Sequence, residues 1–144
     1  FELAFPEIVN YVDATFNTIP DKAHRAIAGL SMGGMHTLMI TANYPDMFNY
    51  IGLYSAGVDF SHLNMEEVPA YANLDAKLTK LAQGNPKLYW IACGNEDWLL
   101  PANKRLMERM DKDGLKYTFH ESPRGHLWSN WRQYSLLFIP QLFK

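Results

Sequence analysis

The sequence predicts an α/β protein with a parallel sheet and flanking helices. Three observations carry this prediction: short apolar runs recur along the chain, segments with apolar residues at helical spacing lie between them, and no linker, internal repeat or low-complexity segment interrupts the alternation. Strands that alternate with helices favour parallel pairing through helical connections. With 144 residues, of which 48% are hydrophobic and 14% aromatic, the chain is long enough to bury one core.

The first predicted element is a helix that begins near Pro6, a residue that fits the first turn of a helix. Apolar residues follow Pro6 at roughly helical spacing up to the turn at Pro20: Ile8, Val12, Phe16 and Ile19. We expect these side chains to form one packed stripe.

A strand, a helix and a second strand follow. Residues 24–30 (HRAIAGL) indicate a short buried strand, and residues 33–43 carry apolar side chains at helical spacing. That helix should end before Tyr44, because the proline at the next position disfavours helical geometry there. Residues 50–55 (YIGLYS) form a second apolar run. Residues 58–72 have no clear period, so we expect a long surface loop of the kind that often covers a site.

The C-terminal half repeats the alternation. Helices are expected over 74–81, 101–113 and 128–140, and strands over 87–94 (KLYWIACG) and 115–120. Apolar and polar residues alternate in the last of these strands, which is typical of a half-buried strand at the border of a sheet. His120 should therefore face solvent.

Composition and charge exclude several classes of function. The net charge is −2, with acidic and basic residues interspersed, so the sequence has no basic patch for nucleic acid or an anionic membrane. No apolar run is long enough to span a bilayer. Cys93, the single cysteine, should be a small buried apolar residue. Neither an H-x-x-x-H pattern nor paired cysteines support a zinc site, so we expect no metal.

The chain opens at Phe1, inside a helix-like segment, and we expect a processed chain or a fragment of a longer one.

The strongest functional signal is the pattern G-x-S-x-G at residues 29–33, where the first strand passes into a helix. A serine at the tip of such a turn has a strained backbone. Its neighbours must be small because strand and helix pass closely there. The N-terminus of the helix would direct N–H groups at a developing oxyanion. We expect Ser31 to be exposed for nucleophilic attack and the Met32 N–H to be one donor of an oxyanion hole.

Two partners for Ser31 occur at the positions where a serine nucleophile needs them. Asp97 directly follows the strand at 87–94, and His126 follows the strand at 115–120. Both therefore lie at the carboxyl ends of parallel strands, in the chain order nucleophile, acid, histidine. Glu96 and His120 are the competing acid and base; we expect Glu96 to be solvated. His24, His36 and His62 lack the surrounding pattern of a catalytic histidine.

Four segments together resemble one known family. AIAGLSMGG, YIGLYSAG, LYWIACGNEDWLL and GHLWSNWRQY, in this order, are similar to the C-terminal half of the esterase-D-like α/β-hydrolases, and especially to their feruloyl and acetylxylan esterase branch. The resemblance implies that Ser31 is the nucleophile, Asp97 the acid and His126 the base. It implies no metal or organic cofactor, a substrate that is an ester on a xylan-type polysaccharide, and a secreted or periplasmic location.

The resemblance covers nearly the whole chain, but family members carry roughly another hundred residues upstream. It therefore implies that residues 1–144 are a partial α/β-hydrolase domain without its upstream strands. The loop that donates the second oxyanion N–H belongs to that upstream part, and a second chain is one possible source of it. We expect the chain alone to be a weak or inactive esterase, with an unpaired apolar edge at residues 24–30.

Several alternatives stay open. Trp98 and Trp128 are candidates for an aromatic wall that stacks on a feruloyl ring or a sugar, or else they pack on helices, which is the reading favoured for Trp131. The fold could also belong to a non-catalytic carbohydrate-binding or interaction module. The same three residues would equally serve a thioester hydrolase of the S-formylglutathione kind or an acyltransferase with a sugar acceptor.

Overall fold

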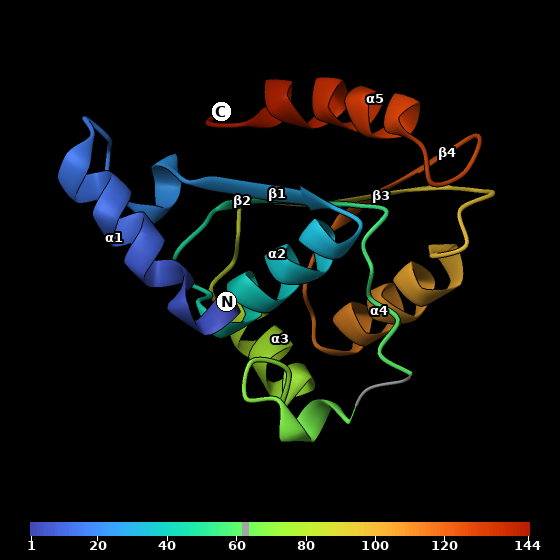
Figure 1. The fold of residues 1–144 in the computed structure, drawn as a ribbon, viewed down its shortest axis with the longest axis horizontal. Coiled ribbons are helices and arrows are strands. Elements are labelled where there is room, and N and C mark those ends of the chain that lie inside the picture. The colour runs from blue at the N-terminus through green and yellow to red at the C-terminus, as the bar shows by residue number, and fades with distance from the viewer. Residues whose placement is uncertain (62–63) are drawn as a thin grey trace.

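A parallel four-stranded sheet forms the centre of the protein, as Figure 1 shows. The computed structural model describes residues 1–61 and 64–144, and His62 therefore lies outside the described residues. The strands are β1 (Ala26–Leu30), β2 (Tyr50–Tyr54), β3 (Leu88–Gly94) and β4 (Thr118–Ser122), and they lie side by side in chain order. The predicted fold class, a parallel sheet with flanking helices, is confirmed.

Helices cover both faces of the sheet. They are α1 (Phe5–Thr15), α2 (Met32–Asn43), α3 (Leu74–Gln83), α4 (Leu100–Lys112) and α5 (Trp128–Phe138). Short 3-10 helices occupy Glu2–Ala4, Lys22–His24, Met65–Glu67 and Ile139–Gln141. In Figure 1, α2, α3 and α4 lie on one face of the sheet and α5 lies on the other. Gly114, just past α4, has φ of 74°, the left-handed geometry expected of a residue beyond a helix end.

Each face of the sheet has its own apolar core. Leu38 of α2, Leu78 of α3 and Leu106 of α4 pack with Ile51 and Ile91 of the two central strands. On the opposite face the core is mostly aromatic, and its buried members are Tyr50, Tyr54, Trp90, Ala92, Trp131, Tyr134 and Phe138. The central strands are thus buried on both sides, which explains why their sequences are continuous apolar runs instead of alternating ones.

The predicted packed stripe on the first helix is wrong. Ile8, Val12, Phe16 and Ile19 are 47%, 37%, 61% and 57% exposed, and no side chain of α1 is buried. The helix also ends at Thr15, before the last two of these residues. Phe5 and Val9 pack against the core, but among the described residues β1 is an edge strand, so no further strand lies beyond it beside the other apolar side chains of α1.

The expectation that His120 faces solvent is also wrong. β4 is an edge strand, as predicted, but it runs from Thr118 to Ser122, later than expected. The His120 ring stacks on Trp90, with centroids 5.8 Å apart and planes 16° apart, and its edge meets Tyr134. Helix α5 covers this face, so both faces of the edge strand are partly packed.

The segment after β2 is a long connection, as expected, and it is anchored at both ends. Val58 and Ala70 are buried, and the Tyr71 hydroxyl donates a hydrogen bond to Glu2 Oε1. Met65–Glu67 forms a short 3-10 helix within it. Across the described residues, no helix combines the length and the apolar character needed to cross a membrane.

Candidate active site

Ser31 occupies a strained turn between β1 and α2. Its backbone has φ 52° and ψ −118°, which a residue with a side chain adopts only when the surrounding structure enforces it. The Ser31 N–H donates to the Tyr54 carbonyl at 2.9 Å, and the Ser31 carbonyl accepts from the N–H groups of Gly34 and Gly57 at 3.0 and 2.7 Å. The end of β2, the residues just after it and the first turn of α2 therefore hold the turn, and the predicted strain is present.

Close packing of α2 against the end of β1 and against the residues after β2 explains two of the glycines around Ser31. A Cβ atom at Gly29 would lie 2.1 Å from the Gly33 carbonyl oxygen, and one at Gly34 would lie 2.7 Å from the Ala56 Cβ. The expectation of small neighbours holds at these two positions. It is wrong for Gly33, because a Cβ atom there would meet no atom within 4 Å.

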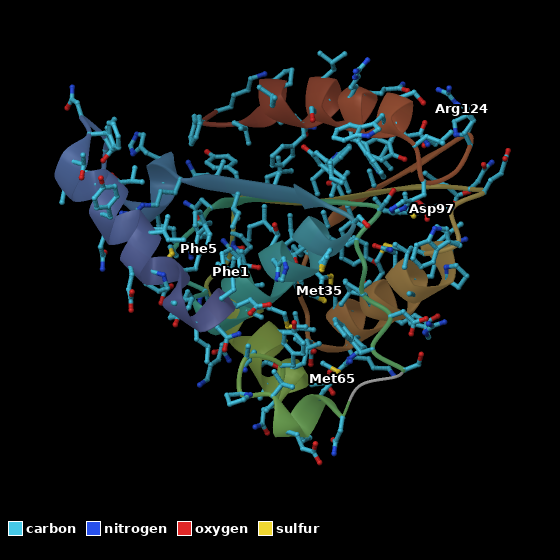
Figure 2. The ribbon with its side chains drawn as sticks, in the orientation of Figure 1. Phe1, Phe5, Met35, Met65, Asp97 and Arg124 are labelled. Carbon is cyan, nitrogen blue, oxygen red and sulfur yellow. The ribbon has the colours of Figure 1, made fainter. Side chains whose placement is uncertain are left out.

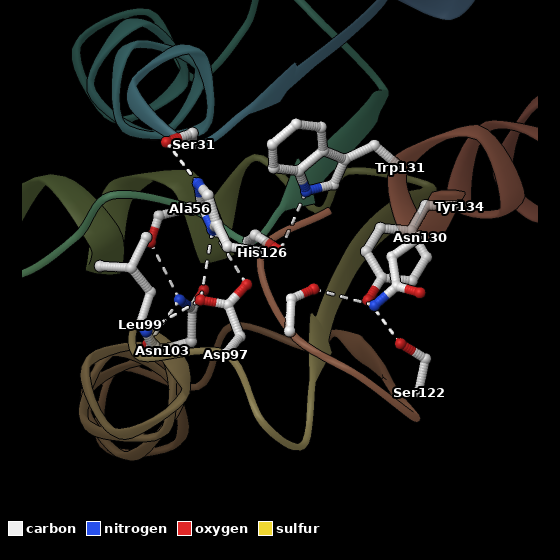
Figure 3. Close-up of polar contacts among 12 residues, drawn as sticks. Ser31, Ala56, Asp97, Leu99, Asn103, Ser122, His126, Asn130, Trp131 and Tyr134 are labelled. Carbon is white, nitrogen blue, oxygen red and sulfur yellow. Dashed lines mark hydrogen bonds and ion pairs between the residues drawn. The ribbon is translucent and has the colours of Figure 1, made fainter. Parts of the chain in front are cut away.

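The structure brings Ser31, Asp97 and His126 together in one chain of hydrogen bonds (Figure 3). His126 Nε2 lies 2.9 Å from Ser31 Oγ, and His126 Nδ1 lies 3.0 and 3.2 Å from the two carboxylate oxygens of Asp97. The Asp97 side chain has no exposed surface and also accepts a hydrogen bond from the Leu99 N–H at 2.9 Å. With Asp97 ionised, Nδ1 is the donor and Nε2 is free to accept the Ser31 hydroxyl proton. The competing acid, Glu96, is exposed, as expected.

Cys93 lies close to Asp97 but does not compete with Ser31 as a nucleophile. Its side chain is fully buried at the end of β3. Burial raises the pKa of the Cys93 thiol to about 12, and the negative charge of Asp97 adds to this effect. The thiol is therefore protonated at neutral pH, and the thiolate is the reactive form of cysteine.

Aromatic rings flank the imidazole of His126 on two sides. Its ring centroid lies 5.4 Å from that of Trp98 and 4.8 Å from that of Trp131. Trp131 is 8% exposed and donates from Nε1 to Ser55 Oγ at 3.1 Å, so its expected packing role is confirmed. Trp98 and Trp128 are 71% and 65% exposed. Their expected role in substrate binding stays a prediction.

Two asparagines hold the loops of the site, and the sequence reasoning missed both. Asn103 of α4 is fully buried and donates from Nδ2 to the carbonyls of Ala56 and Leu99, which joins the Asp97 loop to the end of β2. Asn130 of α5 is 1% exposed and donates to two carbonyls of the His126 loop. Their positions in the sequence were the signal that could have revealed their burial. Each asparagine lies on the apolar face of its helix, four residues from another buried side chain.

His24 and His36 have partners elsewhere. His24 Nδ1 lies 2.8 Å from Asp21 Oδ1, and His36 Nδ1 lies 2.8 Å from Glu2 Oε1. Within residues 1–61 and 64–144 no three His, Cys, Asp or Glu side chains converge as a metal site would require. Met32 is the first residue of α2, so its N–H is among those that have no partner inside the helix.

Comparison with known proteins agrees with this geometry, because the similar proteins include esterases. An endo-1,4-beta-xylanase/feruloyl esterase of Xylanibacter ruminicola is 53% identical over 51 residues, which are 35% of this chain and 7% of that protein. An acetyl esterase of Caldicellulosiruptor saccharolyticus is 27% identical over 89% of this chain and 58% of that protein. A solved ferulic acid esterase structure matches 96% of this chain and 59% of its own, with a TM-score of 0.76 and 24% identity.

The chain thus spans less than two thirds of the length of each of these relatives. The sequence profile of the Esterase family matches residues 5–137, nearly all of the chain. This protein belongs to the Esterase family.

Proposed function

We propose that the chain carries the catalytic centre of a serine esterase, with Ser31 as nucleophile, His126 as general base and Asp97 as the residue that orients the imidazole. One observation carries the proposal: the unbroken hydrogen-bond chain from Ser31 Oγ through both ring nitrogens of His126 to a buried carboxylate. A nucleophile within reach of a base that is itself oriented by a third group is the arrangement that activates serine.

The reaction follows from these positions. Ser31 Oγ attacks the ester carbonyl carbon while His126 Nε2 takes the hydroxyl proton, and Asp97 stabilises the imidazolium that forms. The Met32 N–H donates to the oxyanion of the tetrahedral intermediate. The intermediate collapses to an acyl-enzyme on Ser31, and the alcohol leaves with the proton from Nε2. Water then attacks the acyl-enzyme, His126 takes its proton and returns it to Ser31, and the carboxylic acid is released.

The proposed substrates are feruloyl or acetyl esters on a xylan-type polysaccharide. The names of the relatives support this choice, since they include a xylanase/feruloyl esterase and an acetyl esterase. The exposed ring of Trp98 beside His126 and the exposed ring of Trp128 beside Trp131 would stack on a feruloyl ring or a sugar. A secreted or periplasmic location, where such polysaccharide is met, is part of the same proposal.

The edge of β1 supports a further part of the proposal. Helix α1 and the groove along β1 expose apolar side chains, and a long apolar strand edge invites pairing with another strand. We propose that this edge receives further strands of the same sheet, from a preceding segment of the polypeptide or from a second chain, together with a second oxyanion donor. Removal of one such donor costs about 10²–10³ in turnover in other serine hydrolases, so residues 1–144 alone should be weakly active.

A fluorophosphonate probe tests the proposed centre directly, because it reacts with an activated serine whatever the ester substrate. Labelling should occur at Ser31 and be absent in Ser31→Ala. A non-catalytic carbohydrate-binding module would remain unlabelled although folded. If the protein reacts with the probe, its rates of hydrolysis of feruloyl esters, acetyl esters and S-formylglutathione are then compared. The fastest substrate identifies the acyl group. Equal preference for the thioester would overturn the polysaccharide assignment.

A further inference from the structure

The loop that carries His126 is the feature from which a further inference follows. Residues 123–127 connect β4 to α5, and the loops after β3 and β4 lie at the same end of the sheet, where Figure 2 shows Asp97 and Arg124. Arg124 has φ of 69°, a left-handed geometry that costs energy in a residue with a side chain. The conformation of this loop must therefore be imposed by its contacts.

The first half of the loop is held by the Asp97 loop. The Asn95 N–H donates to the Ser122 carbonyl at 2.8 Å, and the Glu96 N–H donates to the Arg124 carbonyl at 3.1 Å. The approach is so close that a Cβ atom at Gly94 would lie 2.0 Å from the Arg124 carbonyl oxygen. These contacts fix residues 122–124 but leave the Gly125 carbonyl, immediately before His126, to another partner.

That partner is Asn130. Asn130 lies in the first turn of α5 and is labelled in Figure 3. Its Nδ2 donates to the carbonyls of Pro123 and Gly125, both at 3.0 Å. The Gly125 carbonyl belongs to the peptide group that continues into His126, so this hydrogen bond fixes the orientation of that peptide. Asn130 is 1% exposed, and loss of its amide would leave the partly buried Gly125 carbonyl without this donor, while the Pro123 carbonyl would keep the bond from Ser122 Oγ at 3.2 Å.

We propose that Asn130 is a positioning residue: by holding the Pro123 and Gly125 carbonyls, it sets the backbone from which His126 reaches both Ser31 and Asp97. It acts through the His126 loop, because its side-chain amide donates to the carbonyls of that loop and not to the three reacting side chains. The effect of Asn130 on the reactivity of Ser31 rests on the proposed function. Its effect on the position of the His126 ring does not depend on that function.

The test compares Asn130→Ala with a matched control, Asn43→Ala. Asn43 also donates from Nδ2 to two backbone carbonyls, those of Met39 and Ala70 at 2.7 and 2.8 Å, but it lies at the opposite end of α2 from Ser31. Each variant loses two hydrogen bonds of the same kind. Three quantities are measured: stability in urea, the saturation kinetics of Ser31 labelling by a fluorophosphonate, and the ¹⁵N chemical shifts of the His126 ring nitrogens.

For Asn130→Ala we expect the maximal labelling rate to fall about 10- to 100-fold, because displacement of a catalytic group by about 1 Å has costs of that order. The half-saturating probe concentration should change less than about twofold, and the His126 nitrogen shifts should move. Asn43→Ala should lose comparable stability with the labelling rate and the His126 shifts unchanged. If both variants keep wild-type labelling and wild-type His126 shifts, Asn130 is only structural and the proposal is overturned.

Two further outcomes are informative. If the wild-type chain is never labelled, the proposed function fails, while the His126 shifts in Asn130→Ala still decide whether Asn130 positions the ring. If Asn130→Ala does not fold, Asn130→Ser, which keeps one shorter donor, replaces it. An intermediate loss of labelling rate in Asn130→Ser supports the proposal, and a wild-type rate overturns it.

Discussion

Replacement of Asp97 by asparagine should abolish the function of His126 without disturbing the fold. One carboxylate oxygen of Asp97 accepts from the Leu99 N–H at 2.9 Å, and the other lies 3.0 Å from His126 Nδ1. In Asp97→Asn the amide oxygen should keep the Leu99 bond, because the opposite orientation would bring two N–H donors together. The amide NH₂ then faces Nδ1.

This orientation determines the size of the effect. The nearer partner of Nδ1 is then an NH₂ group, which cannot accept a hydrogen bond, and this favours the imidazole tautomer with its proton on Nε2, the nitrogen that lies 2.9 Å from Ser31 Oγ. A base protonated on that nitrogen cannot take the serine proton. The expected loss is about 10⁴-fold in acylation rate, which corresponds to about 5.4 kcal/mol of barrier at about 1.36 kcal/mol per factor of ten. The free energy of unfolding should change by less than about 1.5 kcal/mol, because the Leu99 hydrogen bond is kept.

The assay is the second-order rate of fluorophosphonate labelling of Ser31, measured on the folded protein alongside a urea unfolding curve. Glu96→Gln is the matched control: it removes the adjacent carboxylate, which is exposed and outside the hydrogen-bond chain. We expect the control to label at the wild-type rate. A loss of less than about tenfold in Asp97→Asn, or an equal loss in Glu96→Gln, would refute the role given to Asp97.

Three further predictions concern packing and protonation. Gly29→Ala should lower stability by about 1–3 kcal/mol or more in a urea titration, because the new Cβ would lie 2.1 Å from the Gly33 carbonyl oxygen. Cys93 should resist thiol reagents at pH 8 in the folded protein and react with them in urea. Burial raises the pKa of the Cys93 thiol to about 12. The stability that Cys93 contributes relative to Cys93→Ala should therefore be complete below pH 9 and be lost as the pH rises above 9. Burial tends to raise the pKa of the Glu2 carboxyl group, but hydrogen bonds from its own backbone N–H and from His36 outweigh burial and lower this pKa. Glu2→Gln should therefore reduce the free energy of unfolding at pH values above 4.5, the ordinary pKa, and reduce it progressively less as the pH falls below 4.5.

Much of the fold could be predicted because its signals are local. The buried strands are continuous apolar runs, and proline or glycine marks the ends of the helices around them. The convergence of Ser31, Asp97 and His126 could be predicted because the G-x-S-x-G motif fixes Ser31 on a strand-to-helix turn, and parallel strands bring Asp97 and His126 to the same edge of the sheet.

The errors concern properties that depend on neighbours in space. Periodicity in the first helix shows which face is apolar, but it does not reveal whether another layer covers Ile8 and Val12, and here they are 47% and 37% exposed. The burial of His120 depends on α5, which lies over the edge strand. Asn130 is polar and helical, and from sequence alone such a residue is expected on the surface, so only the structure reveals the two carbonyls it holds.

The order of the strands has a consequence for how the chain acquires its structure. Each strand pairs with the next one along the chain, so no strand has to be inserted between two that are already joined. The contact between Ser31 and His126, which are 95 residues apart, is therefore reached through three successive closures of shorter loops. Because closure entropy and folding time both rise with the separation of contacting residues, a sheet that grows in chain order can assemble a distant contact without the slow search that one long closure would need.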